Sequence, residues 1–183
     1  LINNNSSDKG GGLICEYGSD PVLTNVTIIN NSASQGGGSL YSRADANISA
    51  INSILWSVNS SEIETETGGT VSISYSNVKN GYAGTGNIDS DPLFVNGVNG
   101  DYRLSDYSPA IGAGTSDGAP TTDIDGNPRP NPEGSNPDMG AYENALGAPL
   151  HNSFIHVATT GNDSASVGLS TGPFATIQAG IDY

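Results

Sequence analysis

Basic residues are scarce in this sequence. Only 5 of its 183 residues are Lys or Arg, against 19 that are Asp or Glu, which gives a formal net charge of −14. Nucleic acids and anionic membranes would repel such a chain, so we expect neither as a partner. The same charge favours solubility and divalent cations as ligands. No apolar run is long enough to cross a membrane, so we expect no membrane insertion.

Cysteine is almost absent. The single residue, Cys15, cannot form a disulfide within the chain, which excludes a small domain held together by disulfides. Cys15 matches Ser42 in a repeat, which predicts a small side chain that points inward. A reactive thiol is the alternative, although no His lies nearby in the sequence. Apolar residues make up only 34% of the chain, which is lean for a globule but suits the narrow core of a solenoid.

What the sequence does contain is a repeat. Residues 2–12 and residues 28–38 share Asn-Asn and Gly-Gly-Gly at matching places, and from residue 2 to residue 28 the spacing is 26. Beyond the glycines the spacing becomes 27, which predicts one extra residue near Ser39. A third, degenerate copy includes residues 71–78. A period in the twenties, with short β-branched runs and no heptads, predicts a parallel β-solenoid.

Stacked coils place the apolar side chain of one coil directly on its equivalent in the next. The repeat therefore predicts an inner column of Ile28, Leu55 and Val78. Asn25 and Asn52 share one position at a turn, where an Asn side chain can bond backbone groups that have no strand partner. We expect these two residues to form a structural ladder.

Six motifs carry a resemblance to a known family. They are Asn-Val-Thr-Ile at residues 25–28, Asn-Ser-Ile-Leu-Trp at 52–56, Asp-Pro-Leu-Phe at 91–94, Asp-Tyr-Arg-Leu at 101–104, Ser-Pro-Ala-Ile at 108–111 and Asp-Met-Gly-Ala-Tyr-Glu at 138–143. The chain resembles the pectate-lyase-like superfamily, and more closely its bacterial secreted members of the choice-of-anchor type. The resemblance implies an all-β fold, a right-handed parallel β-helix. It does not imply one function, because the superfamily includes lyases, hydrolases and adhesins.

The motifs suggest a division of the chain. We expect the β-helix coils in residues 1–100, with an acidic loop at residues 59–69 that projects from the third coil. Residues 101–145 are expected to form a C-terminal cap with a long loop. Its short strands, at residues 101–104 and 139–142, would cover the end of the solenoid.

Composition changes again after this cap. Residues 146–153 read as a linker, and residues 154–183 read as a short strand followed by a short amphipathic helix. This pattern resembles the start or N-terminal cap of a following β-helix. Leu1 falls inside a coil, so we interpret the chain as an excised or mature segment of a longer protein.

Candidate catalytic residues are few. A β-helix lyase needs acidic residues that hold Ca²⁺ against an anionic sugar and a base, commonly Arg or Lys, that removes a proton. Arg43 with Asp45 is the one pair that the sequence nominates, and no cluster of Asp and Arg surrounds it. Glycoside hydrolysis would need two carboxylates roughly 5 to 9.5 Å apart, and the sequence does not pair them.

The candidate metal site is a run of alternating oxygen ligands. Asp123, Asp125 and Asn127 are spaced like the first ligands of a Ca²⁺ loop, and Asp138 or Glu133 could complete the site if the loop folds back. The alternative is an Asx turn, in which the carboxylates accept bonds from backbone amides. Ca²⁺ is the one cofactor that the sequence suggests.

Two aromatic residues are candidates for carbohydrate binding. Trp56 and Tyr41 face outward in the repeat register and could stack on sugar rings. The alternative is simple packing between neighbouring strands.

The favoured hypothesis is a non-catalytic extracellular β-helix that serves as a structural, fibre or adhesive module on a bacterial surface. We expect it to associate with itself head to tail, as a filament or a tandem array. The alternative is a polysaccharide lyase, a glycoside hydrolase or a carbohydrate-binding module that acts on an acidic polysaccharide. The sequence leaves open the sugar, the organism and the oligomeric state.

Overall fold

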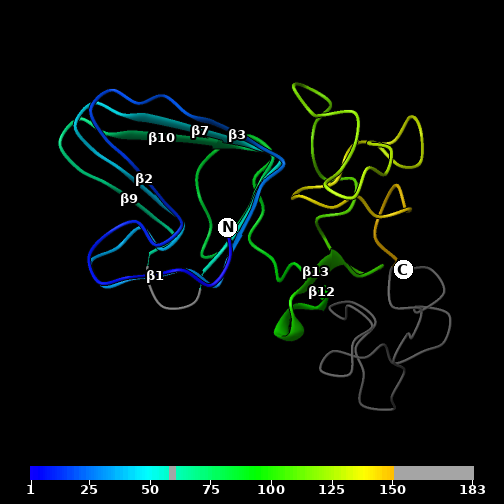
Figure 1. Ribbon diagram of the computed structural model, residues 1–183. Helices are drawn as coiled ribbons and strands as arrows, with labels where there is room; N and C mark the ends of the chain where they lie inside the picture. Colours follow the sequence, from blue (N-terminus) through cyan, green and yellow to red (C-terminus); the bar gives the residue numbers. More distant parts are fainter. Residues whose placement is uncertain (58–60, 151–183) are drawn as a thin grey trace, which may run out of the picture. The chain divides into compact units, whose positions relative to one another are not determined.

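The computed structural model describes residues 1–57 and 61–150, and the strand and helix expected in residues 154–183 lie outside them. The chain divides into two compact units, Leu1–Pro149 and Leu150–Tyr183, and every described strand belongs to the first. The secondary structure of this unit is almost entirely β (Figure 1), with one 3-10 turn at Gly97–Asn99. No helix in the described residues is both long and apolar enough to span a bilayer.

The strands fall into three coils, which follow one another along the sequence. Coil 1 contains β1 (Asn5–Ser6), β2 (Leu13–Cys15), β3 (Val22–Thr24) and β4 (Thr27–Ile29); coil 2 contains β5 (Ser32–Ala33), β6 (Leu40–Ser42), β7 (Asn47–Ile51) and β8 (Ile54–Trp56); coil 3 contains β9 (Ile63–Thr65), β10 (Thr70–Ser74) and β11 (Asn77–Val78). Two further strands come after the coils, β12 (Phe94–Asn96) and β13 (Asp101–Leu104).

Equivalent strands of successive coils pair in parallel. They form the sheets β2-β6-β9, β3-β7-β10 and β4-β8-β11, while β1 pairs with β5. Figure 1 shows β3, β7 and β10 lying side by side. This stacking of parallel strands in register is a solenoid-like architecture.

The predicted inner column is confirmed. Ile28 pairs with Leu55, which pairs with Val78, and all three side chains are fully buried. They belong to one apolar cluster with Leu40 and Ile48, which face the same interior from the other two sheets. The repetition of an apolar residue at one register position therefore builds the core.

The repeat spacing differs from the sequence alignment. Leu13 pairs with Leu40 and Asn5 with Ser32, so the spacing is 27 residues from β1 onward and no slip occurs near Ser39. The 26-residue alignment was wrong because short runs of identical residues, such as Asn-Asn-Asn and Gly-Gly-Gly, match almost as well when they are shifted by one. From coil 2 to coil 3 the spacing shortens to 23 residues, as the pairing of residues 40 and 63 shows.

The prediction of a projecting acidic loop at residues 59–69 is also wrong. Ile63–Thr65 is strand β9 and pairs with β6, and Glu62 before it is only 4% exposed. The glycine at residue 68 belongs to a tight turn, where Thr67 and Gly68 both have positive φ. Alternation of charged and apolar residues here marks a strand with one wet face rather than a projecting loop.

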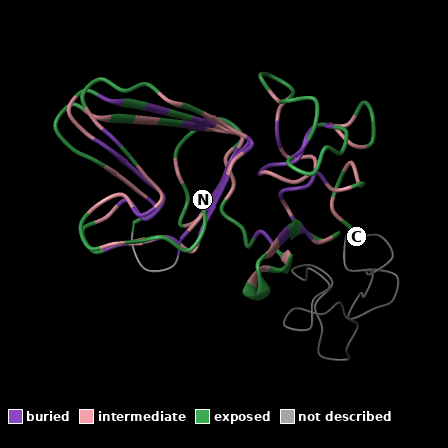
Figure 2. Ribbon diagram, viewed as in Figure 1, coloured by how far each residue is buried: buried purple, intermediate pink, exposed green. Residues whose placement is uncertain are grey.

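The sheet β4-β8-β11 is covered on both faces. Its outer residue Ile54 packs in a second apolar cluster with Leu104, Ala110, Ile111 and Met139 of the C-terminal region, which we define as residues 101–149. Strands β4 and β8 are accordingly buried almost along their whole length (Figure 2).

The expected end cap is therefore different in detail. β13 pairs with β12 in an antiparallel hairpin, but residues 139–142 form no strand. The C-terminal region contacts the outer face of a sheet, while the end of coil 3 is contacted by the segment that comes directly after it. In that segment the Tyr82 hydroxyl donates to the carbonyl of Val71 at 2.9 Å, and Ile88 forms a parallel bridge to Asn77.

Gly140 is one point at which the C-terminal region approaches the sheet closely. Its φ is +95°, and a Cβ there would lie 2.8 Å from Ile54 Cδ1 and 2.9 Å from Thr27 Oγ1. We expect Gly140→Ala to destabilise the protein by about 1–3 kcal/mol more than Gly126→Ala, as overpacking does. Gly126 is the matched control, because its φ is +86° and a Cβ there would meet nothing within 4 Å. Urea unfolding of the two variants measures the difference, and equal losses would show that the contact is not tight.

Candidate functional site

Two asparagines occupy the turn between the second and third sheets of successive coils. Asn25 and Asn52 have φ of 52° and 51°, a left-handed conformation that Asn tolerates better than most residues. Both are buried, and Asn52 Nδ2 donates to Asn25 Oδ1 at 3.4 Å. In coil 3 the equivalent residue is Tyr75, also with positive φ, so the turn persists where the amide does not.

The same two side chains hold the C-terminal region. Asn25 Nδ2 donates to the carbonyl oxygen of Asp138 at 2.9 Å. Asn52 Nδ2 donates to the carbonyl of Thr115 at 2.7 Å, and the Thr115 amide donates back to Asn52 Oδ1 at 2.8 Å. The ladder thus serves both the stacking of coils and the attachment of a segment that lies far away in the sequence.

A buried ion pair organises the C-terminal region. Arg129 Nε donates to Glu143 Oε2 at 2.7 Å, and the two side chains are 1% and 0% exposed. Arg129 Nη2 also donates to the carbonyl of Gly140 at 3.1 Å, and Glu143 Oε1 accepts from the Asn131 amide at 3.1 Å. Removing either charge would leave the other buried and unpaired, so the pair acts as a structural unit.

Asp138 lies beside this pair and is fully buried. Its Oδ1 accepts from the Gly112 amide at 2.7 Å, and its Oδ2 accepts from the Asn144 amide at 2.6 Å. Burial raises the pKa of Asp138 to about 7, and the negative charge of Glu143 adds to the rise. The carboxyl therefore joins two distant backbone segments.

Asp123 is the centre of an Asx turn. Its Oδ1 accepts from the amides of Asp125 and Asn127 at 2.9 and 2.8 Å. Its Oδ2 accepts from Asn127 Nδ2 and from the Glu143 amide, both at 3.0 Å. Burial opposes ionisation, but these hydrogen bonds outweigh it and hold the pKa of Asp123 below its usual value.

These contacts do not fit a calcium site. Both oxygens of Asp123 already accept two N–H groups, Asp138 is enclosed by its own partners, and Asp125 is exposed. Within residues 1–57 and 61–150, no group of three or more His, Cys, Asp or Glu side chains could hold a metal ion. A Ca²⁺ ion at this loop stays a prediction that the described geometry does not support.

The nominated catalytic pair is not assembled. The Arg43 guanidinium forms its ion pair with Glu16 of the preceding coil, which raises the pKa of Arg43. Asp45 lies exposed in a turn with φ of 63°. The side chains that stack between coils are thus Arg43 and Glu16, which are 27 residues apart.

The two aromatic residues that were candidates for stacking on sugars differ in their burial. Tyr41 lies on the outer face of its strand, but it is 0% exposed and is not open to a sugar, because Lys9 covers its ring with Nζ 5.1 Å from the centroid. Trp56 is half-buried, packs beside the second apolar cluster, and has Lys79 Nζ at 5.9 Å from its ring centroid. The loop that carries Lys9 covers Tyr41, and nothing in the repeat register revealed this.

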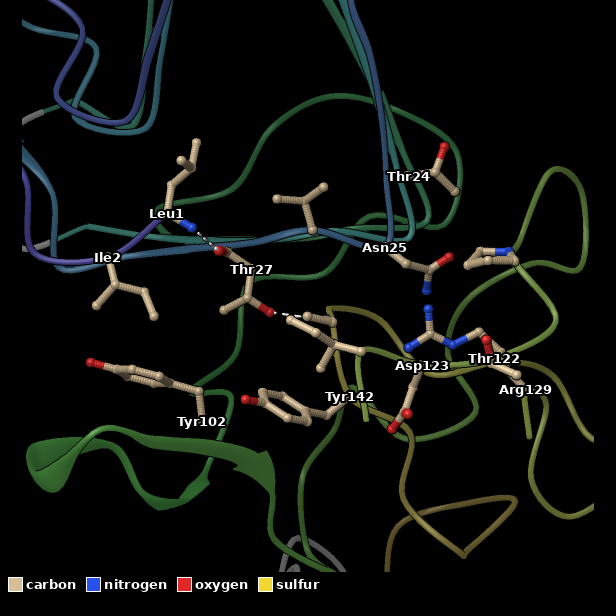
Figure 3. Close-up of a pocket in the computed structure, with 14 residues that line it drawn as sticks. Leu1, Ile2, Thr24, Asn25, Thr27, Tyr102, Thr122, Asp123, Arg129 and Tyr142 are labelled. Carbon is tan, nitrogen blue, oxygen red and sulfur yellow. Dashed lines mark hydrogen bonds between the residues drawn. The ribbon is translucent and has the colours of Figure 1, made fainter. Parts of the chain in front are cut away.

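An apolar cavity that sequence reasoning missed lies between coil 1 and the C-terminal region (Figure 3). Its volume is about 410 Å³. Figure 3 shows Leu1 and Ile2 on one side and the rings of Tyr102 and Tyr142 on the other, with Asn25 and Arg129 further along. The remaining lining residues are Thr24, Val26, Thr27, Pro120, Thr122, Asp123, Ile124 and Ala141. Much of the wall comes from loops, which carry no periodic signal.

A second cavity, of about 500 Å³, lies within the C-terminal region and the hairpin before it. Its lining is polar and includes Arg103, Asp106, Asp125 and Asn144. Arg103 is held by Asp101 in an exposed ion pair at 2.5 Å, which lowers the pKa of Asp101 to about 2. The cavity therefore combines acidic and amide side chains with apolar ones such as Val95 and Leu104.

Comparisons of the chain with protein-family models, with curated proteins and with solved structures find no match.

We predict that stability falls as pH rises from 5 to 7. The pKa values of Asp138 and Glu62 are raised by burial, so the folded state holds their protons more tightly than the unfolded chain does. For Asp138, the free-energy cost of ionising the buried carboxyl is absent below its unfolded pKa of 3.8. This cost grows as pH rises toward the folded pKa of about 7. On linkage grounds we expect a loss on the order of 2–4 kcal/mol.

Thermal melting at pH 5 and pH 7 measures this dependence. Asp138→Asn should flatten the slope whatever its effect on absolute stability, while Asp125→Asn, at an exposed position, should leave the slope unchanged. A melting temperature that rises with pH across this window would contradict the prediction.

Proposed function

We propose that the chain is a right-handed parallel β-helix of the pectate-lyase-like type that serves as a non-catalytic structural or adhesive module on a bacterial surface. The right-handed path is supported by the strong preference for right-handed connections between parallel strands of one sheet. The surface location is supported by the resemblance of the motifs to those of bacterial secreted proteins.

One observation carries the non-catalytic part of the proposal. Each of the five basic side chains in the sequence is engaged by an oxygen. The partners are Glu66 for Lys9, Glu16 for Arg43, the Ser57 carbonyl for Lys79, Asp101 for Arg103 and Glu143 for Arg129. A lyase base must be free to approach a sugar proton. Basic groups used within the protein support a structural role over proton abstraction.

Head-to-tail association is supported by the uneven ends of the stack. Among the described residues, β2, β3 and β4 have strand neighbours only on the coil 2 side. Apolar side chains lie partly exposed at this end, among them Leu1 at 50% and Ile2 at 42%. Leu13, Leu23 and Val26 cover the core cluster there and are only partly buried. Open edges and apolar ends of solenoids need a covering element.

We therefore expect the chain to self-associate through the coil 1 end. Leu23→Lys should abolish association, because Leu23 pairs with the buried Ala50 and so points toward the core at that end. Val22→Lys is the matched control, since Val22 is on the same strand but points outward and is 70% exposed. Sedimentation velocity across a range of concentrations, with circular dichroism to verify folding, gives the answer.

Two outcomes would overturn the proposal. One is a chain that stays monomeric at every concentration. The other is release of unsaturated products from a uronate-containing polysaccharide that Arg43→Ala abolishes, since this would establish a lyase.

A further inference from the structure

The polar cavity of about 500 Å³ has three sides. The hairpin of β12 and β13, with the loop after it, forms the first side; the Asx turn around Asp123 forms the second; and residues 142–145 form the third. Asn131 lines the cavity as well. The volume lies within the range of about 300–1,000 Å³ that is typical of small-molecule sites.

Hydrogen bonds between these sides hold the cavity in shape. Asn144 Nδ2 donates to the carbonyl of Leu104 and to Asp106 Oδ1, both at 3.1 Å, which joins the third side to the first. The Glu143 amide donates to Asp123 Oδ2 at 3.0 Å, which joins the third side to the second. Because the walls are already ordered, a ligand that binds here need not pay for ordering them.

Several polar groups of the lining have no partner within residues 1–57 and 61–150. Asp125 and Asn131 bond through their backbone amides, and neither side chain takes part in a hydrogen bond there. One carboxylate oxygen of Asp106 and the Oδ1 atom of Asn127 are also open. Water satisfies such groups in the free protein, so a ligand that displaces it must reproduce these hydrogen bonds.

The charges of the lining select the class of ligand. An anion would meet the open carboxylates of Asp106 and Asp125, while Arg103, the basic residue of the lining, is already paired with Asp101. An ammonium group would offer no acceptor to the side-chain amides. A metal ion is disfavoured, since no group of three or more acidic, His or Cys side chains in the described part of the chain could hold one. A hydroxyl group both donates and accepts, and so suits carboxylates and amides together.

The lining also has an apolar component. Tyr142 contributes a half-buried ring, and Val95 contributes a side chain that is 53% exposed. A sugar ring carries hydroxyl groups at its edge and C–H groups on its faces, so one face can stack on an aromatic ring while the edge bonds polar groups. Both kinds of contact are available in this one cavity.

We propose that the polar cavity binds a neutral sugar. Tyr142 stacks on a C–H face of the ring, and Asp106 and Asp125 accept hydrogen bonds from its hydroxyl groups. Asn131 donates to a sugar oxygen. This site goes beyond the proposed function, which names no ligand, and it does not depend on self-association.

Two-dimensional NMR of the ¹⁵N-labelled full chain, titrated with glucose, galactose, mannose and xylose, tests the site. We expect at least one of these sugars to shift the side-chain amide signals of Asn127 and Asn131, with saturation in the millimolar range. The side chain of Asn96 lies outside the lining, so its signals should not move. The uronic acid of the best-bound ring should bind at least about tenfold more weakly, because like charges oppose each other. The corresponding amino sugar should bind no more tightly than the neutral one.

Two pairs of variants locate the contacts. Asp125→Ala should weaken binding by about tenfold, as loss of a hydrogen bond to a charged group does. Asp117→Ala is its matched control, because Asp117 is also an exposed aspartate before a glycine but does not line the cavity. Tyr142→Ala should weaken binding by about five- to tenfold through loss of stacking. Its control is Tyr107→Ala, which removes an exposed tyrosine outside the lining. Circular dichroism verifies that each variant is folded.

The outcomes decide between the ligand classes. The site is overturned if none of the four sugars shifts the two asparagines, or if Asp125→Ala and Asp117→Ala weaken binding equally. Tighter binding of the amino sugar would show a cation site and overturn the neutral ligand. A chain that binds the sugar as expected but stays monomeric upholds this site and overturns head-to-tail association alone.

Discussion

In-register stacking of parallel strands is the constraint on which the rest of this structure depends. Because each strand lies directly on its equivalent, whatever one coil needs at a position the next coil needs as well. In the core, this constraint places an apolar residue at the same position of each coil, namely Ile28, Leu55 and Val78. At the left-handed turn, it places an asparagine at the same position of the first two coils, Asn25 and Asn52. Each Asn side chain satisfies polar groups that a turn between sheets leaves without strand partners.

The C-terminal region is held by a different kind of interaction. It has little regular secondary structure, so its backbone amides need partners other than neighbouring strands. Carboxylates provide them: Asp123, Asp138 and Glu143 together accept from amides of residues spread between 112 and 144. The Arg129 guanidinium offsets part of the charge that this arrangement buries. Acidic residues that looked like metal ligands thus order a loop.

The sequence predicted the parts of the fold that repeat. Apolar residues at matching positions identified the inner column, because stacking requires an apolar side chain at the same inward position of each coil. The glycine run misled the alignment by one residue, since Gly10 donates to the carbonyl of Gly36 while lying beside Gly37 in the ladder register. A sequence repeat defines its register only where neighbouring residues differ from one another.

The candidate site was less predictable, for physical reasons. The face on which Tyr41 lies follows from alternation, but its burial depends on Lys9 and the loop that carries it. The partner of Arg43 is a residue one full coil away, whereas the sequence suggested the neighbour Asp45. Loops such as residues 120–124, which line the apolar cavity, follow no period at all.

The bond from Asn25 to the carbonyl of Asp138 joins residues that are 113 positions apart. Contacts between coils span only 23 to 27 positions, so during synthesis on a ribosome coils 1 and 2 can stack long before residue 138 exists. Throughout that interval Ile54 and the outer side of β8 face water without their cover. Nascent chains in this state present an apolar sheet face to one another, and ribosomes crowded on one message would bring such faces together. The order of translation therefore exposes, for a time, an apolar face that the C-terminal region covers in the finished molecule.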